Sequence, residues 1–381
     1  MILNSYNDWS PLKEIIVGSA ENYISHERDL SFDTFFHDNL FRSDWAYPRL
    51  NRRKGLEKES SNWKIKQRYV EELNEDVEGL VKTLKDLGVK VHRPLKLPPN
   101  AQSIRGLGWE SIPVPALNIR DNTLIVGNEI IEMAPQVRSR YLETRLLTKV
   151  FAHYFNEGAK WSTMPRPILT DLSFDLSYAR DMETTLGGPT EPIEDPASSP
   201  YDVGFEAMLD GAQCLRLGRD ILVNIANKNH ALGCNWLERH LGKEYRVHRI
   251  YRMSDNHIDS MLLALRPGVF LARHSDIKKL LPEPFDKWKI IVAPEPSENN
   301  FPKYDDGDLV LTSPYIDLNV LSINVDTILV NESGVDLIRK LEKEGFNVIP
   351  VKHRHRRLFG GGFHCFTLDT VREGEIEDYT K

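Results

Sequence analysis

Hydrophobic residues follow two patterns along this chain, short continuous runs and longer stretches with helical spacing. Short runs rich in Ile, Val, Leu and Phe predict buried β-strands. Such runs occur at residues 15–17, 123–126, 221–223, 269–271, 290–292, 327–330 and 348–351. In residues 62–87 the apolar side chains, among them Val70, Leu73 and Val77, recur every three or four positions. This spacing predicts an amphipathic helix that ends at Gly88.

Two further helices are predicted at residues 229–241 and 335–344, and each is followed at once by a glycine. The order strand, strand, helix, strand recurs, most clearly between residues 318 and 351. The chain is therefore predicted to have a mixed α/β fold.

The glycines do not form a nucleotide-binding motif. No Gly-x-Gly-x-x-Gly follows a strand and opens a helix, and residues 360–362 precede a short strand instead. Residues 186–200 are rich in Gly, Pro, Ser and acidic residues, which predicts a long loop. No stretch has the composition of an interdomain linker, so we expect residues 1–381 to form a single domain.

Composition and charge narrow the class of protein. The 381 residues are 40% hydrophobic and 28% charged, which is typical of a water-soluble globular protein. A net charge of −7 argues against nucleic-acid binding. The basic run at residues 352–357 is a local exception, interpreted as a solvated loop, with the binding of an anionic group as the alternative. No transmembrane segment or targeting peptide is expected, and three scattered cysteines favour a reducing compartment, so we expect a cytoplasmic location.

Cys365 has the most informative surroundings of the three cysteines. It follows the triple glycine 360–362 and directly follows His364. Glycine permits positive φ and close approach of the backbone to a ligand, so a thiol placed after it can meet a substrate. The alternative is a buried, inert cysteine at the start of a strand. Cys365 alone does not decide between these interpretations.

A nucleophilic cysteine needs a base and a group that orients the base. His257 is the best candidate, because in an extended segment His257 and Asp259 would face one pocket while Ile258 faces the core. Asp210 follows an apolar stretch and precedes a glycine, so it is either a partner of a histidine or a turn or capping residue. Asp121 precedes a strand and has the same two interpretations. Carboxylates that converge on a cysteine and a histidine would suit a guanidinium substrate.

A metal site is the competing chemistry. His353 and His355 could supply two ligands, and His364 with Cys365 two more. Their spacing matches no structural zinc site, and no Cys-x-x-Cys occurs. The residues alone therefore give little support to a metal site.

Taken together, several segments resemble the amidinotransferase family, the relatives of arginine:glycine amidinotransferase. The resemblance covers nearly the whole chain and is densest in residues 7–18, 126–132, 158–161, 257–259 and 360–365. It implies a five-bladed α/β propeller of ββαβ modules with pseudo-fivefold symmetry around a central active site. This is the fold of guanidine-modifying enzymes, and it agrees with the repeated strand, strand, helix, strand order.

The resemblance also implies a role for individual residues. Cys365 matches the family's nucleophile, His257 its general acid and base, and Asp210 the aspartate that orients the histidine. Two more carboxylates, those of Asp121 and Asp259, match the residues that hold the guanidinium group of arginine. Thr312 and Ser313 stand where glycine-using members have two serines that contribute to substrate binding, so the threonine departs from that pattern.

The implied reaction is a ping-pong transfer of the amidino group from L-arginine to a primary amine. It proceeds through an amidino-cysteine, releases L-ornithine and requires no metal or cofactor. Ser254 and Asn256 replace an asparagine and a methionine of the glycine-using members, and such replacements accompany larger acceptors. We therefore expect a secondary-metabolite amine as acceptor, such as a precursor of a saxitoxin-type toxin. Glycine and lysine are the alternatives, and a deiminase-type hydrolase is the alternative reaction. A homodimer is expected.

Overall fold

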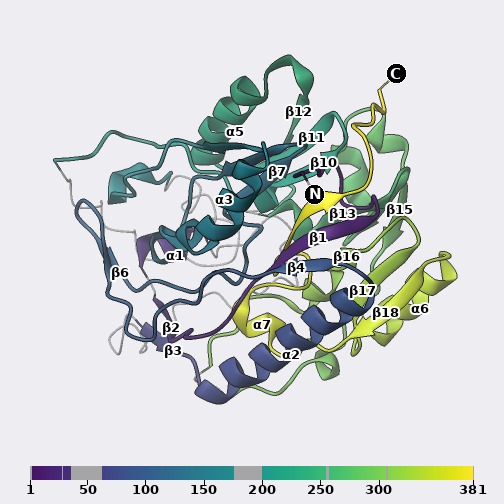
Figure 1. Cartoon of the computed structure of the whole chain (residues 1–381), viewed down its shortest axis with the longest axis horizontal. Coiled ribbons are helices and arrows are strands. Elements are labelled where there is room, and N and C mark those ends of the chain that lie inside the picture. Colours follow the sequence, from purple (N-terminus) through teal and green to yellow (C-terminus); the bar gives the residue numbers. More distant parts are fainter. Residues whose placement is uncertain are drawn as a thin grey trace, which may run out of the picture.

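The computed structural model describes residues 2–27, 29–35, 62–175, 200–254, 257–305 and 308–380. Within these ranges the strands form five three-stranded sheets and two small two-stranded sheets (Figure 1). The first four three-stranded sheets contain β7 (Thr123–Val126), β8 (Glu129–Glu132) and β9 (Lys160–Thr163); β10 (Cys214–Leu217), β11 (Asp220–Ile225) and β12 (Arg246–Tyr251); β13 (Leu262–Arg266), β14 (Val269–Ala272) and β15 (Lys289–Val292); and β16 (Leu321–Ser322), β17 (Thr327–Asn331) and β18 (Asn347–Val351).

The fifth three-stranded sheet joins the two ends of the chain. It contains β19 (Thr367–Arg372), β1 (Leu12–Val17) and β4 (Lys90–His92), and Figure 1 shows the purple β1 beside the yellow C-terminal part of the chain. The small sheets pair β2 (Ser25–Glu27) with β3 (Asn62–Lys64) and β5 (Ile104–Arg105) with β6 (Glu110–Ser111).

All five three-stranded sheets have the same topology. The central strand pairs antiparallel with one neighbour and parallel with the other. A parallel pair needs a crossover. In four sheets the crossover contains a helix, namely α2 (Gln67–Asp86), α3 (Thr148–Asn156), α5 (Lys228–Leu241) or α6 (Val335–Lys343). Between β14 and β15 two 3₁₀ turns, Ser275–Leu280 and Phe285–Lys287, replace the helix. The predicted mixed α/β fold is confirmed.

Most predicted elements occur close to their expected positions. Each predicted strand run lies within a strand, and the predicted helices correspond to α2, α5 and α6. The helix expected from residue 62 begins only at Gln67, because residues 62–64 pair with β2. Strands such as β12 were not predicted, since its sequence Arg-Val-His-Arg-Ile-Tyr contains no continuous apolar run. The short helices α1 (Leu30–Phe35) and α7 (Arg356–Phe359) were also not predicted.

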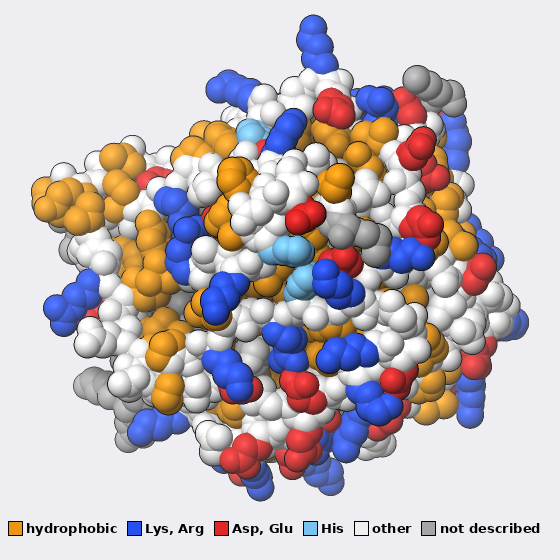
Figure 2. All heavy atoms as spheres, in the orientation of Figure 1, with side chains coloured by type: hydrophobic (Ala, Val, Ile, Leu, Met, Phe, Trp, Pro, Cys, Tyr) orange, Lys and Arg blue, Asp and Glu red, His pale blue; other side chains and the backbone are white. Residues whose placement is uncertain are grey.

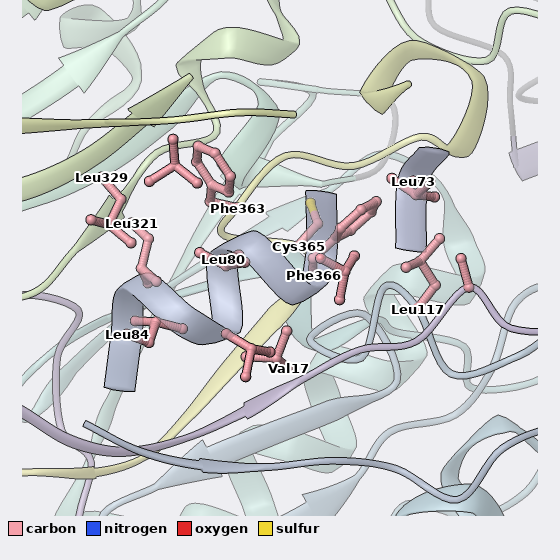
Figure 3. Packing of buried hydrophobic residues seen from close by; sticks show 14 of the residues in the cluster. Val17, Leu73, Leu80, Leu84, Leu117, Leu321, Leu329, Phe363, Cys365 and Phe366 are labelled. Carbon is pink, nitrogen blue, oxygen red and sulfur yellow. The ribbon is translucent and has the colours of Figure 1, made fainter. Parts of the chain in front are cut away.

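One apolar cluster connects α2 to two of the sheets and contains Cys365. Leu80 of α2 packs with Val17 of β1 and Leu329 of β17, and Phe366 and Cys365 belong to the same cluster (Figure 3). These side chains are almost completely buried. The thiol therefore has apolar neighbours on one side, in keeping with the buried-cysteine interpretation, and its polar neighbours are described below.

The surface carries no large block of one charge on the face in Figure 2, where Lys, Arg, Asp and Glu are interspersed. The interpretation of residues 352–357 as a solvated loop is wrong. His353, His355 and Arg356 are buried, and Arg356 binds Asp317 while Arg354 binds Asp76. These carboxylates neutralise the arginines, so the run folds against the protein.

No helix in the described part of the chain is both long and apolar enough to cross a membrane. The loop predicted at residues 186–200 lies outside the described residues, apart from Pro200.

Candidate active site

Cys365 lies in a turn between α7 and β19 that Asn319 holds in place. The backbone N–H groups of Gly362 and Cys365 both donate to Asn319 Oδ1, at 3.1 and 2.9 Å. The Cys365 thiol donates to Asp259 Oδ2 at 3.4 Å. Asn319 Nδ2 also donates to Asp259 Oδ2, at 3.2 Å. One asparagine thus fixes the backbone of the thiol and its carboxylate neighbour together.

The triple glycine has two different roles in this turn. Gly360 ends α7 in the left-handed region at φ +70°, as expected for a glycine cap. Gly362 is needed for close packing, since a Cβ there would lie 2.7 Å from both the Cβ and the carbonyl oxygen of Asn319. The expected close approach is therefore to a neighbouring segment of the protein.

His257 and Asp210 form a hydrogen-bonded pair. His257 Nε2 lies 2.8 Å from Asp210 Oδ2, and Asp210 is 1% exposed. Asp210 also precedes the 3₁₀ turn Gly211–Gln213, and its N–H donates to Gln213 Oε1 at 2.9 Å. Both interpretations of Asp210, capping residue and histidine partner, therefore hold together.

The segment after His257 is not extended as predicted. Residues Ile258–Ser260 form a 3₁₀ turn, with His257 at its N-terminal end. Ile258 is nevertheless buried in the core, and Asp259 contacts Cys365. The hydroxyl of Ser260 donates to the His257 carbonyl at 2.7 Å, a local bond that favours the turn over a strand.

Asp121 is held by a partly buried arginine, Arg140. Arg140 Nη1 donates to Asp121 Oδ2 at 2.6 Å, and Arg140 also binds both carboxylate oxygens of Glu143, at 2.5 and 3.0 Å. Asp121 and Glu143 are each 3% exposed. The other oxygen of Asp121, Oδ1, lies 3.8 Å from His257 Nδ1, beyond hydrogen-bond distance.

Asp121 and Asp259 each keep one carboxylate oxygen unused. Asp121 Oδ2 accepts from Arg140, and Asp259 Oδ2 accepts from Asn319 and Cys365. The Oδ1 atom of each carboxylate is buried without a hydrogen-bond partner among the described residues. A buried acceptor without a donor is costly, so this arrangement suits a ligand with several N–H groups.

The charges around the thiol and the histidine act in opposite directions. Burial raises the pKa of the Cys365 thiol well above its usual range, and the charges of Asp259 and Asp121 raise it further. Burial alone would lower the pKa of His257, but Asp121 and Asp210 raise it to about 9. At neutral pH the site without ligand therefore holds a thiol and an imidazolium, and an incoming cation would favour the thiolate.

The remaining predicted binding residues have different surroundings. Thr312 Oγ1 is buried and has no hydrogen-bond partner among the described residues. Ser313 Oγ accepts from Tyr315 N at 3.2 Å and caps the 3₁₀ turn Pro314–Leu318. Ser254 Oγ lies 3.4 Å from Ser260 Oγ. Asn256 lies outside the described residues.

The histidines considered as metal ligands have separate partners. His353 Nε2 bonds the carbonyl of Gly361, and His355 Nε2 bonds Glu72. Within the described ranges no three His, Cys, Asp or Glu side chains are grouped so that they could hold a metal ion.

Several residues of the site were not found by sequence reasoning, namely Arg140, Glu143, Asn319 and His364 as the partners of the predicted carboxylates and thiol. His364 was considered only as a metal ligand. Arg140 and Glu143 were detectable as a charged pair three residues apart in a stretch that is otherwise half apolar, but such pairs are common on surfaces.

A cavity of about 60 Å³ lies beside His257 and Asp121. Aromatic rings and acidic groups from β2 and the residues before it, from α1 and from the 3₁₀ turn Glu143–Leu147 after β8 surround it, including those of Tyr23, Glu27, Phe32, Phe35 and Glu143. The Phe35 ring meets the His257 ring edge-on, with centroids 5.4 Å apart.

Comparison with known proteins identifies the family. No protein-family model matches the chain. The chain is 32% identical to the L-arginine:L-lysine amidinotransferase of Pseudomonas savastanoi pv. phaseolicola, over 98% of this chain and 96% of that protein. It is 30% identical to inosamine-phosphate amidinotransferase 1 of Streptomyces glaucescens, over 99% of both.

Solved structures agree with these relatives. An amidinotransferase of the saxitoxin biosynthetic pathway from Microseira wollei is 29% identical and superposes with a TM-score of 0.79, over 99% of both chains. The inosamine-phosphate amidinotransferase of Streptomyces griseus is 30% identical, with a TM-score of 0.80 over 99% of both chains. The chain therefore belongs to the amidinotransferase family, whose members are enzymes that transfer amidino groups.

Proposed function

We propose that this enzyme takes the amidino group from L-arginine, carries it on Cys365 and passes it to a primary amine. The observation that carries the proposal is the pair of unused oxygens on Asp121 and Asp259, next to a thiol and a histidine. A guanidinium group is planar and rich in N–H donors, so it would supply the partners that these two oxygens lack.

In the first half-reaction the guanidinium group binds between Asp121 and Asp259. Its positive charge offsets the carboxylates that raise the pKa of the thiol, so Cys365 loses its proton to solvent. The Cys365 thiolate then forms a bond to the guanidinium carbon, and the bond from this carbon to Nε of arginine breaks. His257, an imidazolium at neutral pH, gives a proton to the departing amine, and L-ornithine leaves.

In the second half-reaction the acceptor amine replaces ornithine. Its nitrogen bonds to the amidino carbon, the bond to Sγ breaks, and His257 takes the proton that the amine loses. The thiolate and the imidazolium are restored, and the product is a guanidino compound. Asp210 keeps the His257 ring oriented through both halves. Among the predicted binding residues, Thr312 is the better substrate contact, because Ser313 already caps a turn.

We infer that the acceptor is an amine larger than glycine, such as a secondary-metabolite precursor of the saxitoxin type. The cavity beside His257 supports this, because its lining combines aromatic rings with Glu27. Arg140, the arginine in the lining, is already paired with Asp121 and Glu143. The carboxylate of glycine would meet acidic groups there, whereas an amine with an apolar body and a second cationic group would be stabilised. Lysine remains the alternative.

We also infer that the five three-stranded sheets are the blades of a pseudo-fivefold propeller around this site. Their common topology supports the proposal, as does the fact that side chains on or next to three of the sheets meet at one point, namely Arg120, Arg216 and Asp369. A single domain of residues 1–381 and a homodimer are part of the same proposal.

The test is to mix the enzyme with L-arginine in the absence of an acceptor. Intact-protein mass spectrometry should reveal one amidino group on Cys365 and an equal amount of ornithine in solution. The C365A variant should bind arginine but release no ornithine. Ornithine release by C365A at the wild-type rate would overturn the covalent mechanism.

The same mixture separates transfer from hydrolysis. A deiminase-type hydrolase would turn arginine alone into citrulline at a steady rate. For a transferase, turnover should begin only when an amine is added. Steady citrulline formation at the rate at which ornithine forms with an acceptor would favour the hydrolase.

A further inference from the structure

A second histidine lies beside the thiol, and the mechanism above does not use it. His364 is 4% exposed and immediately precedes Cys365. Its Nδ1 lies 2.7 Å from Asp259 Oδ2, the same oxygen that accepts from the Cys365 thiol. Its Nε2 faces Asp8 at 3.8 Å from Oδ2, beyond hydrogen-bond distance, and is buried without a hydrogen-bond partner among the described residues. The imidazole ring thus lies between two buried carboxylates.

The ring position determines which nitrogens carry protons. Neutral imidazole has one N–H and one lone pair, whereas imidazolium has two N–H groups. Nδ1 must donate to Asp259, so in the neutral ring a lone pair on Nε2 would face the Asp8 carboxylate. Asp8 is ionised, because Arg216 above all, followed by His364 and then Arg120, holds its pKa far below the usual range despite its burial. An imidazolium donates from Nδ1 to Asp259, and its positive charge, with an N–H on Nε2 directed toward Asp8, offsets part of the charge of both carboxylates.

His364 also determines which carboxylate oxygen of Asp259 remains available to a ligand. Asp259 Oδ2 accepts from His364, Asn319 and Cys365, and this leaves Oδ1 as the unused oxygen. Burial alone would raise the pKa of Asp259, but the hydrogen bond and charge of His364 hold it below its usual value. Without His364, Asp259 loses the donor that fixes its Oδ2 atom and would be free to rotate.

We propose that His364 is a positioning residue that stays positively charged between Asp8 and Asp259, fixes Asp259 for substrate and favours the thiolate of Cys365. The charged or titratable groups that face it are Asp8, Asp259, Cys365 and Arg120, whose Nε donates to the His364 carbonyl at 3.0 Å. The proposal extends the proposed function, because it assumes that the thiolate of Cys365 is the reactive form.

The first test measures thiolate formation without any transfer reaction. Chloroacetamidine alkylates a thiolate, forming a carbon–sulfur bond and releasing chloride, and its amidinium group matches the proposed clamp. H364Q should slow alkylation of Cys365 at pH 7.5 at least about tenfold, which corresponds to a rise of one unit in the pKa of the thiol. H355Q is the matched control, since His355 is equally buried and bonded to a carboxylate, that of Glu72. Equal alkylation rates in H364Q and wild type would overturn the proposal.

The second test needs no variant and applies even if H364Q does not fold. Neutron diffraction from wild-type crystals grown at pH 7 in deuterated buffer should place deuterium on both ring nitrogens of His364. Deuterium on Nδ1 alone would overturn the proposed charge. Both measurements are independent of ornithine formation. A charged His364 in an enzyme that forms no ornithine would therefore reject the proposed function and retain this inference.

Discussion

At the scale of single residues, the site consists of buried carboxylates whose two oxygens have different tasks. In Asp121 and Asp259 one oxygen is fixed by the protein and the other is left for a ligand. This division explains why the site needs Arg140 and Asn319, residues that sequence motifs did not indicate. Asp210 has the same arrangement, with Oδ2 bonded to His257 and Oδ1 buried without a hydrogen-bond partner among the described residues, but its charge also helps keep the imidazole protonated.

D210N should move the alkaline limit of activity to lower pH. His257 must be protonated to release ornithine, and with its pKa at about 9 the wild-type enzyme should lose activity only as the pH rises through about 9. An amide at position 210 removes one of the charges that raise this pKa. Ornithine formation, measured from pH 6 to 10, should fall about 10²-fold or more in D210N and decline from a lower pH. An alkaline limb that stays at pH 9 in D210N would show that another group controls it.

E27Q should change the choice of acceptor. Glu27 lines the cavity beside His257, and its Oε2 accepts from Ser111 Oγ at 2.6 Å. Removing its charge should lower kcat/KM for alkyl diamines and lysine about tenfold, and for alkyl monoamines of equal length much less. Ornithine release, followed by mass spectrometry with each of these amines as acceptor, measures kcat/KM for the diamines and for the monoamines. An equal loss for monoamines and diamines would indicate a structural role of Glu27.

At the scale of elements, the short turns decide the geometry of the site, and this is where sequence prediction reaches its limit. Apolar patterns predicted the central strands of four of the five three-stranded sheets and three of the crossover helices, because these elements are buried and burial requires apolar side chains at regular positions. The 3₁₀ turn Ile258–Ser260 has no such period and was expected to be extended. Asn319 lies 46 residues from Cys365, and no local pattern relates the two. The predicted partners of the thiol depended on the family resemblance.

G362A should damage the site through one such turn. The new methyl group would lie 2.7 Å from the backbone and Cβ of Asn319, so Asn319 must move and its bond to Cys365 N must lengthen. We expect kcat to fall at least tenfold and the free energy of unfolding to fall by about 1–3 kcal/mol. Steady-state kinetics and urea unfolding measure these effects. G79A is the control, because Gly79 lies in α2 with no atom within 4 Å of the added Cβ. It should leave kcat unchanged and raise stability by about 0.5–1 kcal/mol.

At the scale of the whole molecule, a buried cluster of charges lies next to the turn that contains Cys365 and connects distant parts of the chain. Asp369 of β19 accepts from Arg120 before β7 at 2.6 Å and from Arg216 of β10 at 2.9 Å. It also accepts from Arg372 of β19 and from Ser5 near the N-terminus. Asp369 is fully buried, so its charge joins three sheets and the N-terminal segment at one point.

D369N should therefore destabilise the whole fold. The charges of Arg216, Arg372 and Arg120 hold the pKa of Asp369 well below its usual range although burial opposes this, so at pH 7 the carboxylate is ionised. An amide would leave buried guanidinium groups without their counter-charge, which costs about 3–5 kcal/mol. D86N is the control, because the Lys82–Asp86 pair is exposed and should contribute less than about 1 kcal/mol. Urea unfolding at pH 7, followed by both fluorescence and circular dichroism, compares the two variants. If Asp369 connects the sheets, both signals should shift together in D369N. A shift no larger than that of D86N would mean that the apolar clusters alone hold the sheets together, and that the buried charges serve only to place His364 and Cys365.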